Sequence, residues 1–207
     1  MEALVDPTEA ELMVLCAAAA ERGTGFCRVL GSAEQQEWLD AALEAVWSAA
    51  AGQTVADECA DLLDALVLEE DEGGTEDPTA GPGFFADQSA GLVGEALAMA
   101  MTPSAERVET VLRTVRSLLS MADFTLSGEK PVIVRAGQTP PAGPLVSREL
   151  EARREALALL ARDRQDAEGE GYPPRRDVLI ELREATRAFV TEVTPSLEEF
   201  AEGKNWL

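Results

Sequence analysis

The sequence predicts an all-α fold, a single-domain bundle of about seven helices with an acidic loop at 69–83 and a Pro/Gly-rich insertion at 127–146. Apolar residues recur at helical spacing through long segments, capping residues and glycines mark the ends of these segments, and strand-like alternation is missing. With 207 residues, of which 46% are hydrophobic and 27% charged, the chain can bury one core.

Two helices are expected before residue 53. The run Asp6–Glu9 supplies an N-cap residue, a proline at the first helical position and an early acid, and Gly23 ends this helix. Ser32 and Gln35 form a capping-box pattern before the second helix, which ends at Gly52. The apolar stripe of the second helix consists of Trp38, Leu39, Ala42, Leu43, Val46 and Trp47.

Three further helices are expected in the middle of the chain. The third begins at Thr54, with Asp57 in its first turn, and its apolar face consists of Cys59, Leu62, Leu63, Leu66 and Val67. Asp87 is the expected N-cap of a fourth helix that runs to Met101. The pair Thr102-Pro103 opens the fifth, whose inward residues are Val108, Val111, Leu112, Val115, Leu118 and Leu119.

The last two helices follow the insertion. Ser147 begins the sixth, with Leu150, Leu157, Leu159 and Leu160 on its apolar side. Glu168–Gly171 is a loop, and Pro173-Pro174 precede the seventh helix, which carries Val178, Leu179, Leu182 and Phe189. Pro195 is expected to break this helix before a short tail, because proline removes a backbone hydrogen bond.

The charge is large and unevenly distributed. The formal net charge is −22 and there is no histidine, which excludes His-based catalytic triads, His-ligated metals and imidazole acid–base chemistry. Residues 1–100 hold 21 acids and two bases, whereas residues 101–207 hold 18 acids and 15 bases. The arginines of the second half alternate with acids, so we expect exposed helix faces that pair with the acidic half and no direct binding of nucleic acid.

The three cysteines, Cys16, Cys27 and Cys59, are an odd set without CxxC spacing. Each has apolar neighbours and none has a nearby base, so buried, unreactive thiols in a reducing compartment are expected. The longest apolar run, Leu12–Ala20, is too short to cross a bilayer, and no leader segment is recognisable. We therefore expect a cytoplasmic protein without membrane contact. Its abundant alanine and its preference for arginine over lysine are typical of a GC-rich bacterial coding sequence.

The densest acidic region is residues 57–77, in which 10 of 21 residues are acids. Asp57, Asp61 and Asp64 lie at i, i+4 and i+7, so their carboxylates share one helical stripe and repel one another. The stripe is compatible with a solvated helix face, a surface for a basic partner, or a metal site. As a partner-binding surface it would include Asp57, Asp61, Asp64, Glu69, Glu70, Asp71 and Glu72.

One spacing favours the metal alternative. Glu34 and Glu37 are followed by Glu58 and Asp61, an ExxE…ExxD pattern that resembles the Mg²⁺ motif of all-α nucleoside triphosphate pyrophosphohydrolases of the MazG type. Carboxylates at i,i+3 on two facing helices can hold hard cations, and the resemblance implies metals that bind a triphosphate and activate water. The same acids also suit a first helical turn, where they favour the helix dipole without any function.

A second resemblance covers most of the chain. Glu21-Arg22 precede Phe26-Cys27, a glycine follows, and an amphipathic helix then runs to Leu43–Trp47. This arrangement resembles the YjaG-like family of small bacterial helical proteins of unknown function. The chain departs from that layout by long insertions at 127–146 and 168–174. The resemblance implies an all-α fold, but no activity, cofactor or site residues.

Together these observations predict a non-enzymatic binding protein. Its acidic first half would face a basic protein partner, such as a toxin or an enzyme, in the manner of an immunity protein or inhibitor. No cofactor is needed for that role. The alternative is the Mg²⁺-dependent pyrophosphohydrolase with Glu34, Glu37, Glu58 and Asp61 as metal ligands.

Overall fold

The computed structural model describes residues 6–66, 81–128, 141–166 and 174–207. Helices account for nearly all of the described chain, which contains no strand, so the predicted all-α bundle is confirmed. The seven expected helices are present, and a short additional helix, α2, follows the first. The helices are α1 (Glu9–Arg22), α2 (Gly25–Leu30), α3 (Ala33–Ala50), α4 (Ala56–Asp64), α5 (Pro82–Met101), α6 (Ala105–Ser127), α7 (Pro144–Asp166) and α8 (Arg176–Gly203).

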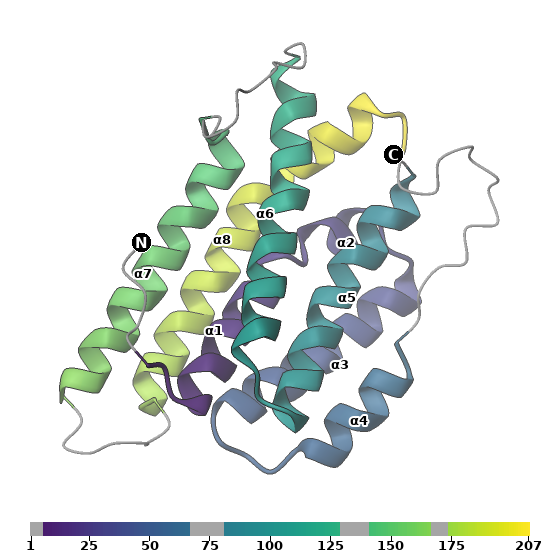
Figure 1. The fold of residues 1–207 in the computed structure, drawn as a ribbon. Coiled ribbons are helices and arrows are strands. Elements are labelled where there is room, and N and C mark those ends of the chain that lie inside the picture. Colours follow the sequence, from purple (N-terminus) through teal and green to yellow (C-terminus); the bar gives the residue numbers. More distant parts are fainter. Residues whose placement is uncertain (1–5, 67–80, 129–140, 167–173) are drawn as a thin grey trace.

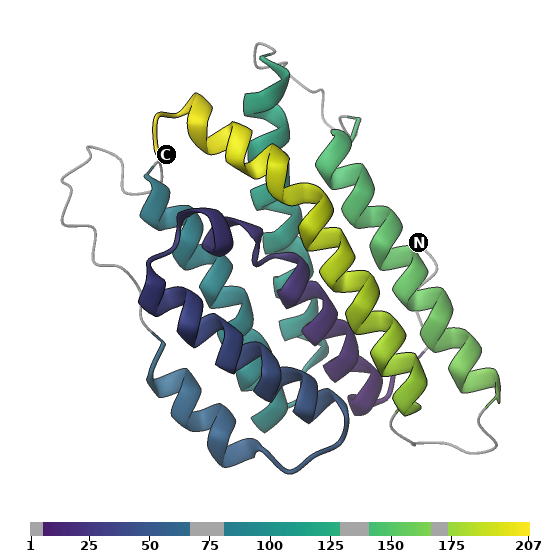
Figure 2. The same cartoon turned by 180° about the vertical axis from the view of Figure 1, so that it is seen from behind.

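Helix α1 lies at the centre of the bundle. It packs against α3, α5, α6, α7 and α8, and Figure 2 shows it between α3 and α8. The run Cys16–Ala20 is fully buried, and its four consecutive alanines let neighbouring helices approach from several sides. The outer positions are taken by α4 on one edge and α7 on another (Figure 1).

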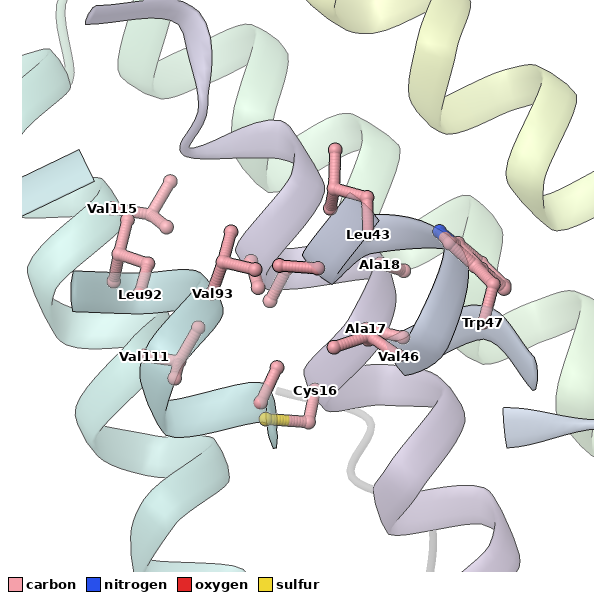
Figure 3. Close-up of a cluster of buried hydrophobic side chains, with 14 of the residues drawn as sticks. Cys16, Ala17, Ala18, Leu43, Val46, Trp47, Leu92, Val93, Val111 and Val115 are labelled. Carbon is pink, nitrogen blue, oxygen red and sulfur yellow. The ribbon is translucent and has the colours of Figure 1, made fainter. Parts of the chain in front are cut away.

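The core is one cluster of buried apolar residues to which all eight helices contribute. Figure 3 shows part of it, where Cys16 of α1, Val46 of α3, Val93 of α5 and Val111 of α6 come together. The stripe predicted for residues 33–50 is buried throughout, from Trp38 to Trp47. Periodicity therefore identified the inward face of α3 correctly. On α7 it did so only in part, because Leu160 is buried but Leu150, Leu157 and Leu159 are only half-buried.

The helix starts agree with the sequence patterns only in part. The capping box of Ser32 and Gln35 is present as predicted. The cap of α1 is Thr8, which forms a capping box with Glu11, and not Asp6. The expected start of the third helix at Thr54 is also wrong, because α4 begins after Val55 without a side-chain cap.

Two helices begin earlier than predicted. Helix α5 starts at Pro82, inside the predicted acidic loop 69–83, and Asp87 lies within the helix and accepts a hydrogen bond from Gln35 of α3 at 2.9 Å. Helix α7 starts at Pro144 and not at Ser147, so the last residues of the predicted insertion 127–146 are helical. Ser127, at the other limit of that insertion, is the last residue of α6.

The early start of α7 has a long-range cause. The carboxylate of Asp123 on α6 accepts hydrogen bonds from the backbone N–H groups of Leu145 and Val146 at 2.9 and 3.0 Å. These donors have no partner within their own helix, so a cap from another helix stabilises this end. A Cβ on Gly143 would lie 2.4 Å from the Asp123 carboxylate, so the close approach requires glycine there.

Pro195 does not end the last helix, contrary to prediction. Helix α8 continues through it to Gly203, and Figure 2 shows the final part turned away from the earlier axis. Val193 and Leu197, on either side of the proline, are both buried, so the apolar stripe is continuous across it. Packing against the core thus compensates for the missing backbone hydrogen bond, and the proline bends the helix instead.

Candidate functional site

The predicted acidic stripe is on the outer face of α4. Asp57, Asp61 and Asp64 are exposed, and none of their carboxylates makes a hydrogen bond or ion pair with a residue that the structure describes. The remaining residues of the predicted partner surface, 69–72, lie outside the described residues. The described part of the surface is therefore a helix face with three carboxylates that have no counter-ion among the described residues.

The opposite face of α4 holds the helix in place. Cys59 is fully buried, and the indole N–H of Trp38 on α3 donates a hydrogen bond to the carbonyl of Leu62 at 2.8 Å. Leu63 and Leu66 lie near Gly94 of α5, where an added Cβ would be 3.5 and 3.2 Å from their methyl groups. The helix is thus anchored on α3 and α5, at one edge of the bundle (Figure 1), and its carboxylates are exposed.

The ExxE…ExxD residues do not form a metal-ligand cluster. Glu34, Glu37, Glu58 and Asp61 are all exposed, and within the described parts of the chain no group of three or more acidic, cysteine or histidine residues is arranged to hold a metal ion. Gln35, between the first two acids, is the residue that points inward. The spacing therefore places these acids on α3 and α4 without bringing them together.

The two bases of the acidic half both form ion pairs within the chain, one at the surface and one in the interior. Arg28 pairs with Asp40 at 2.5 Å, and Arg22 pairs with Glu149 of α7 at 3.3 Å. Arg164 of α7 pairs with Glu11 of α1, as expected for arginines that neutralise the acidic half. These arginines therefore pair with acids of α1, α3 and α7, and no base among the described residues pairs with the acids of α4.

A second group of charges joins α1, α3 and α8. Arg183 forms an ion pair with Glu44 and lies over the ring of Trp47, 5.7 Å from its centroid. Arg187 pairs with Glu21 at 3.5 Å and with Glu44 at 3.3 Å. Glu21 is buried and accepts a hydrogen bond from the indole N–H of Trp47 at 2.6 Å. This cluster ties the acidic half to the last helix.

Two buried carboxylates respond differently to their surroundings. Burial raises the pKa of Glu21, and the Trp47 indole and the two arginines compensate for this only in part. Burial acts in the same direction on Glu11, but its hydrogen bonds with Arg164 and Thr8 outweigh it and lower the pKa of Glu11. Neither residue was predicted from the sequence to be a buried, paired carboxylate, because Arg164 and Arg187 lie far along the chain on other helices.

The structure also contains a cavity that was not predicted from the sequence. It lies between α7 and α8, has a volume of about 490 Å³, and has Arg22 on its wall. Arg22 is 3% exposed and its partner Glu149 is 1% exposed, so this ion pair is fully internal. One sequence feature could have pointed to Arg22: it is one of only two bases in the first 100 residues, and it directly follows the apolar run of its helix.

The predicted burial of the three cysteines is confirmed. Cys16, Cys27 and Cys59 are buried and form no disulfide. Burial raises the pKa of Cys16 to about 12 and also raises the pKa of Cys59. Thiols of this kind are inert as nucleophiles, because the thiolate is the reactive form.

Comparison with known proteins yields no relative. No family model, no curated protein and no solved structure matches the chain. The resemblance to the YjaG-like family therefore stays a prediction from the sequence. None of the helices in the described residues is long and apolar enough to cross a membrane.

Proposed function

We propose that this chain is a non-enzymatic binding protein of the immunity or inhibitor type, which covers a basic surface on a partner such as a toxin or enzyme. Its binding face is the acidic side of α4 with Asp57, Asp61 and Asp64, together with the acidic run Glu69–Glu72. The protein would act in the cytoplasm, where its thiols stay reduced, and would need no cofactor.

The observation that carries the proposal is the lack of counter-ions on α4. Its three exposed carboxylates repel one another on one stripe and find no base among the described residues. At other positions arginines form ion pairs with acids, as Arg164 does with Glu11. A basic partner would relieve this repulsion, and the field of the −22 chain would speed its approach.

The test is a pull-down from host lysate with tagged wild-type protein and two variants. In the first variant, Asp57, Asp61 and Asp64 become Asn. The matched control changes Glu198, Glu199 and Glu202 on α8 to Gln, since these acids are also exposed and make no ion pair with a described residue. Both variants lose the same three charges, so a difference between them reports position and not net charge.

We expect a stoichiometric basic protein to bind wild-type protein and the α8 control, and to be lost with the α4 variant and at high salt. Equal capture by both variants would contradict the proposed face. The pyrophosphohydrolase alternative predicts instead that Mg²⁺ raises the melting temperature beyond the effect of ionic strength and that Glu58→Gln removes the increase.

A further inference from the structure

One stretch of α6 carries exposed arginines and no exposed acid. After Glu109, the remaining acid of this helix is Asp123, which is buried and bound to the start of α7. Arg113 and Arg116 lie on the same stretch, and both are exposed and make no ion pair with a described residue. The chain has 39 acids and 17 bases, so a surface on which only bases are exposed is unusual for it.

The neighbouring side of α7 continues this surface. Its first residue is Val146, whose backbone N–H donates to Asp123 of α6. Helical spacing of i+4 and i+7 then places Leu150 and Arg153 on the same side of α7 as Val146. Arg153 is half-buried, Arg154 next to it is exposed, and neither makes an ion pair with a described residue. Two further arginines therefore lie toward α6.

The acids of this part of α7 are occupied or lie elsewhere on the helix. Glu149 is buried and pairs with Arg22 at 3.3 Å. Glu151 pairs with Arg148 at 3.5 Å. Glu155 lines the cavity that separates α7 from α8. None of these three carboxylates pairs with the two arginines that lie toward α6.

The arginines of the two helices lie at a similar height in the bundle. The end of α6 and the start of α7 lie together, so the two helices run in opposite directions (Figure 1). Arg116 precedes Asp123 by about two helical turns, and on α7 Arg153 follows Val146 by about two turns. Both arginines are thus about 11 Å along their helices from the same contact.

Two large apolar side chains are exposed beside these arginines. Met121 and Phe124 are 42% and 49% exposed. Phe124 follows Arg113 at i+11, so it lies on the same stripe of α6, and Met121 is one turn before it. Phenylalanine, methionine and arginine are the residue types that are enriched in protein-binding surfaces. Their combination therefore favours a protein as the occupant.

We propose that one face of α6 and α7 binds an acidic amphipathic helix of a protein partner. This α6–α7 face consists of Arg113, Arg116, Met121, Phe124, Arg153 and Arg154. The carboxylates of the partner helix would pair with the four arginines, and its apolar side chains would contact Met121 and Phe124.

Charge complementarity also distinguishes this occupant from other anions. A nucleic acid or an anionic membrane brings a dense array of negative charges, which a chain with a net charge of −22 repels. Four arginines would offset only a small part of that repulsion. An acidic helix brings a few carboxylates, and it also covers the exposed apolar side chains.

This face is separate from the acidic face of α4. Helices α4 and α7 lie at different edges of the bundle (Figure 1). The protein would thus join two partners, a basic one on α4 and an acidic one on the α6–α7 face. The second proposal does not rest on the first, because each is tested with its own variants and its own probe.

The test is fluorescence anisotropy of a labelled peptide added to the full chain at about 0.15 M NaCl. The peptide has about 18 residues, so that it can form a helix, with Leu along one side and Glu beside it. The control peptide has Gln in place of every Glu. We expect saturable one-to-one binding of the acidic peptide, at least about tenfold tighter than that of the Gln peptide.

Charge variants locate the binding face. The triple variant Arg113→Gln/Arg116→Gln/Arg154→Gln should weaken binding of the acidic peptide by about tenfold, because three charge pairs are lost. The matched control is Arg162→Gln/Arg176→Gln/Lys204→Gln, which removes three exposed bases that also make no ion pair with a described residue. It should bind the peptide like wild-type protein.

Apolar variants test the second half of the proposal. Met121→Ala/Phe124→Ala should also weaken binding by about tenfold, because apolar area is no longer buried by the peptide. The control is Ile180→Ala/Leu207→Ala, since these side chains are also exposed and lie on the last helix and at the C-terminus. All four side chains are exposed, so both variants should keep the circular dichroism of wild-type protein.

Four results would overturn the proposal. The first is the absence of saturable binding of the acidic peptide, and the second is equal binding of the acidic and the Gln peptide. The third is equal weakening by the α6–α7 charge variant and its control. The fourth is tighter binding of a DNA duplex or of phosphatidylserine vesicles than of the peptide, which would assign the arginines to another class of ligand.

Discussion

Helix α4 and the first half of α8 both present charged faces, but the ion pairing of these two faces differs. On α8, Arg183 and Arg187 form ion pairs with Glu21 of α1 and Glu44 of α3, so these two acids are compensated. On α4, the stripe that contains Asp61 has no compensating base among the described residues. The difference separates charges that hold helices together from charges that remain available to a partner.

Two ion pairs of the molecule also differ strongly in burial. Arg22 and Glu149 are almost completely removed from solvent, whereas Arg28 and Asp40 form their ion pair at the surface. A buried pair costs much more to break than an exposed one, because the remaining charge loses both water and partner. The most informative stability experiments therefore remove one member of each pair.

The largest effect is expected from Arg22→Met. It leaves Glu149 buried without its partner, so the free energy of unfolding should fall by about 3–5 kcal/mol. The double variant Arg22→Met/Glu149→Leu should recover most of the loss. Arg28→Met is the surface control and should cost less than about 1 kcal/mol. Urea denaturation of the four proteins measures the difference, and equal losses for Arg22→Met and Arg28→Met would refute the distinction between the two pairs.

The next effect concerns the end of α7. Asp123→Ala removes the acceptor for the N–H groups of Leu145 and Val146, and should destabilise the protein by about 1–3 kcal/mol. Hydrogen exchange should speed up first at these two amides. Unchanged protection there would show that the carboxylate does not cap the helix.

These cases show what could be predicted from the sequence. Local patterns identified the inward face of α3 and the capping box of Ser32, because a helix encodes both within one or two turns. The start of α7 depends on Asp123, 22 residues away from Leu145, and this contact leaves no mark in the local pattern. The path of α8 through Pro195 was mispredicted for the same reason, since packing with other helices overrode a local signal.

The candidate sites divide in the same way. Because α4 is amphipathic, the sequence was sufficient to place Asp57, Asp61 and Asp64 on one exposed face. Spacing alone also suggested a metal set with Glu34 and Glu37, which α3 and α4 do not assemble. The cavity at Arg22 could not be predicted from the sequence, because it is formed by three helices, of which α1 is distant along the chain from α7 and α8.

The two buried carboxylates give opposite dependences of stability on pH. The pKa of Glu11 is lowered on folding, so its contribution is complete above about pH 4.5 and is lost as the pH falls through its folded value. The pKa of Glu21 is raised, so its contribution is complete below about pH 4.5 and is lost as the pH rises through its folded value. Unfolding free energies should therefore be measured from about pH 3 to 7 for both variants. Glu11→Gln should lose the part of the pH dependence below about pH 4.5, and Glu21→Gln the part above it. Identical profiles for the two variants would contradict these assignments.

The smallest effect on stability should come from the acidic stripe. Changing Asp57, Asp61 and Asp64 to Asn removes repulsion and no described contact, so unfolding free energy should stay constant or rise by about 0.2–0.5 kcal/mol per pair. Urea denaturation beside the Glu198/Glu199/Glu202→Gln control measures this. A loss above about 1 kcal/mol in the α4 variant alone would mean that these acids support the fold.

Binding of a basic partner to the exposed acids of α4 should depend on electrostatic attraction. The association rate constant with the captured partner tests this, when it is measured by stopped flow at low salt and at about 0.5 M NaCl, where exposed charges are screened. We expect a steep fall with salt for wild-type protein and for the α8 control, and a slow rate with little salt dependence for the α4 variant. A rate that is the same for all three proteins, or that salt leaves unchanged, would contradict it.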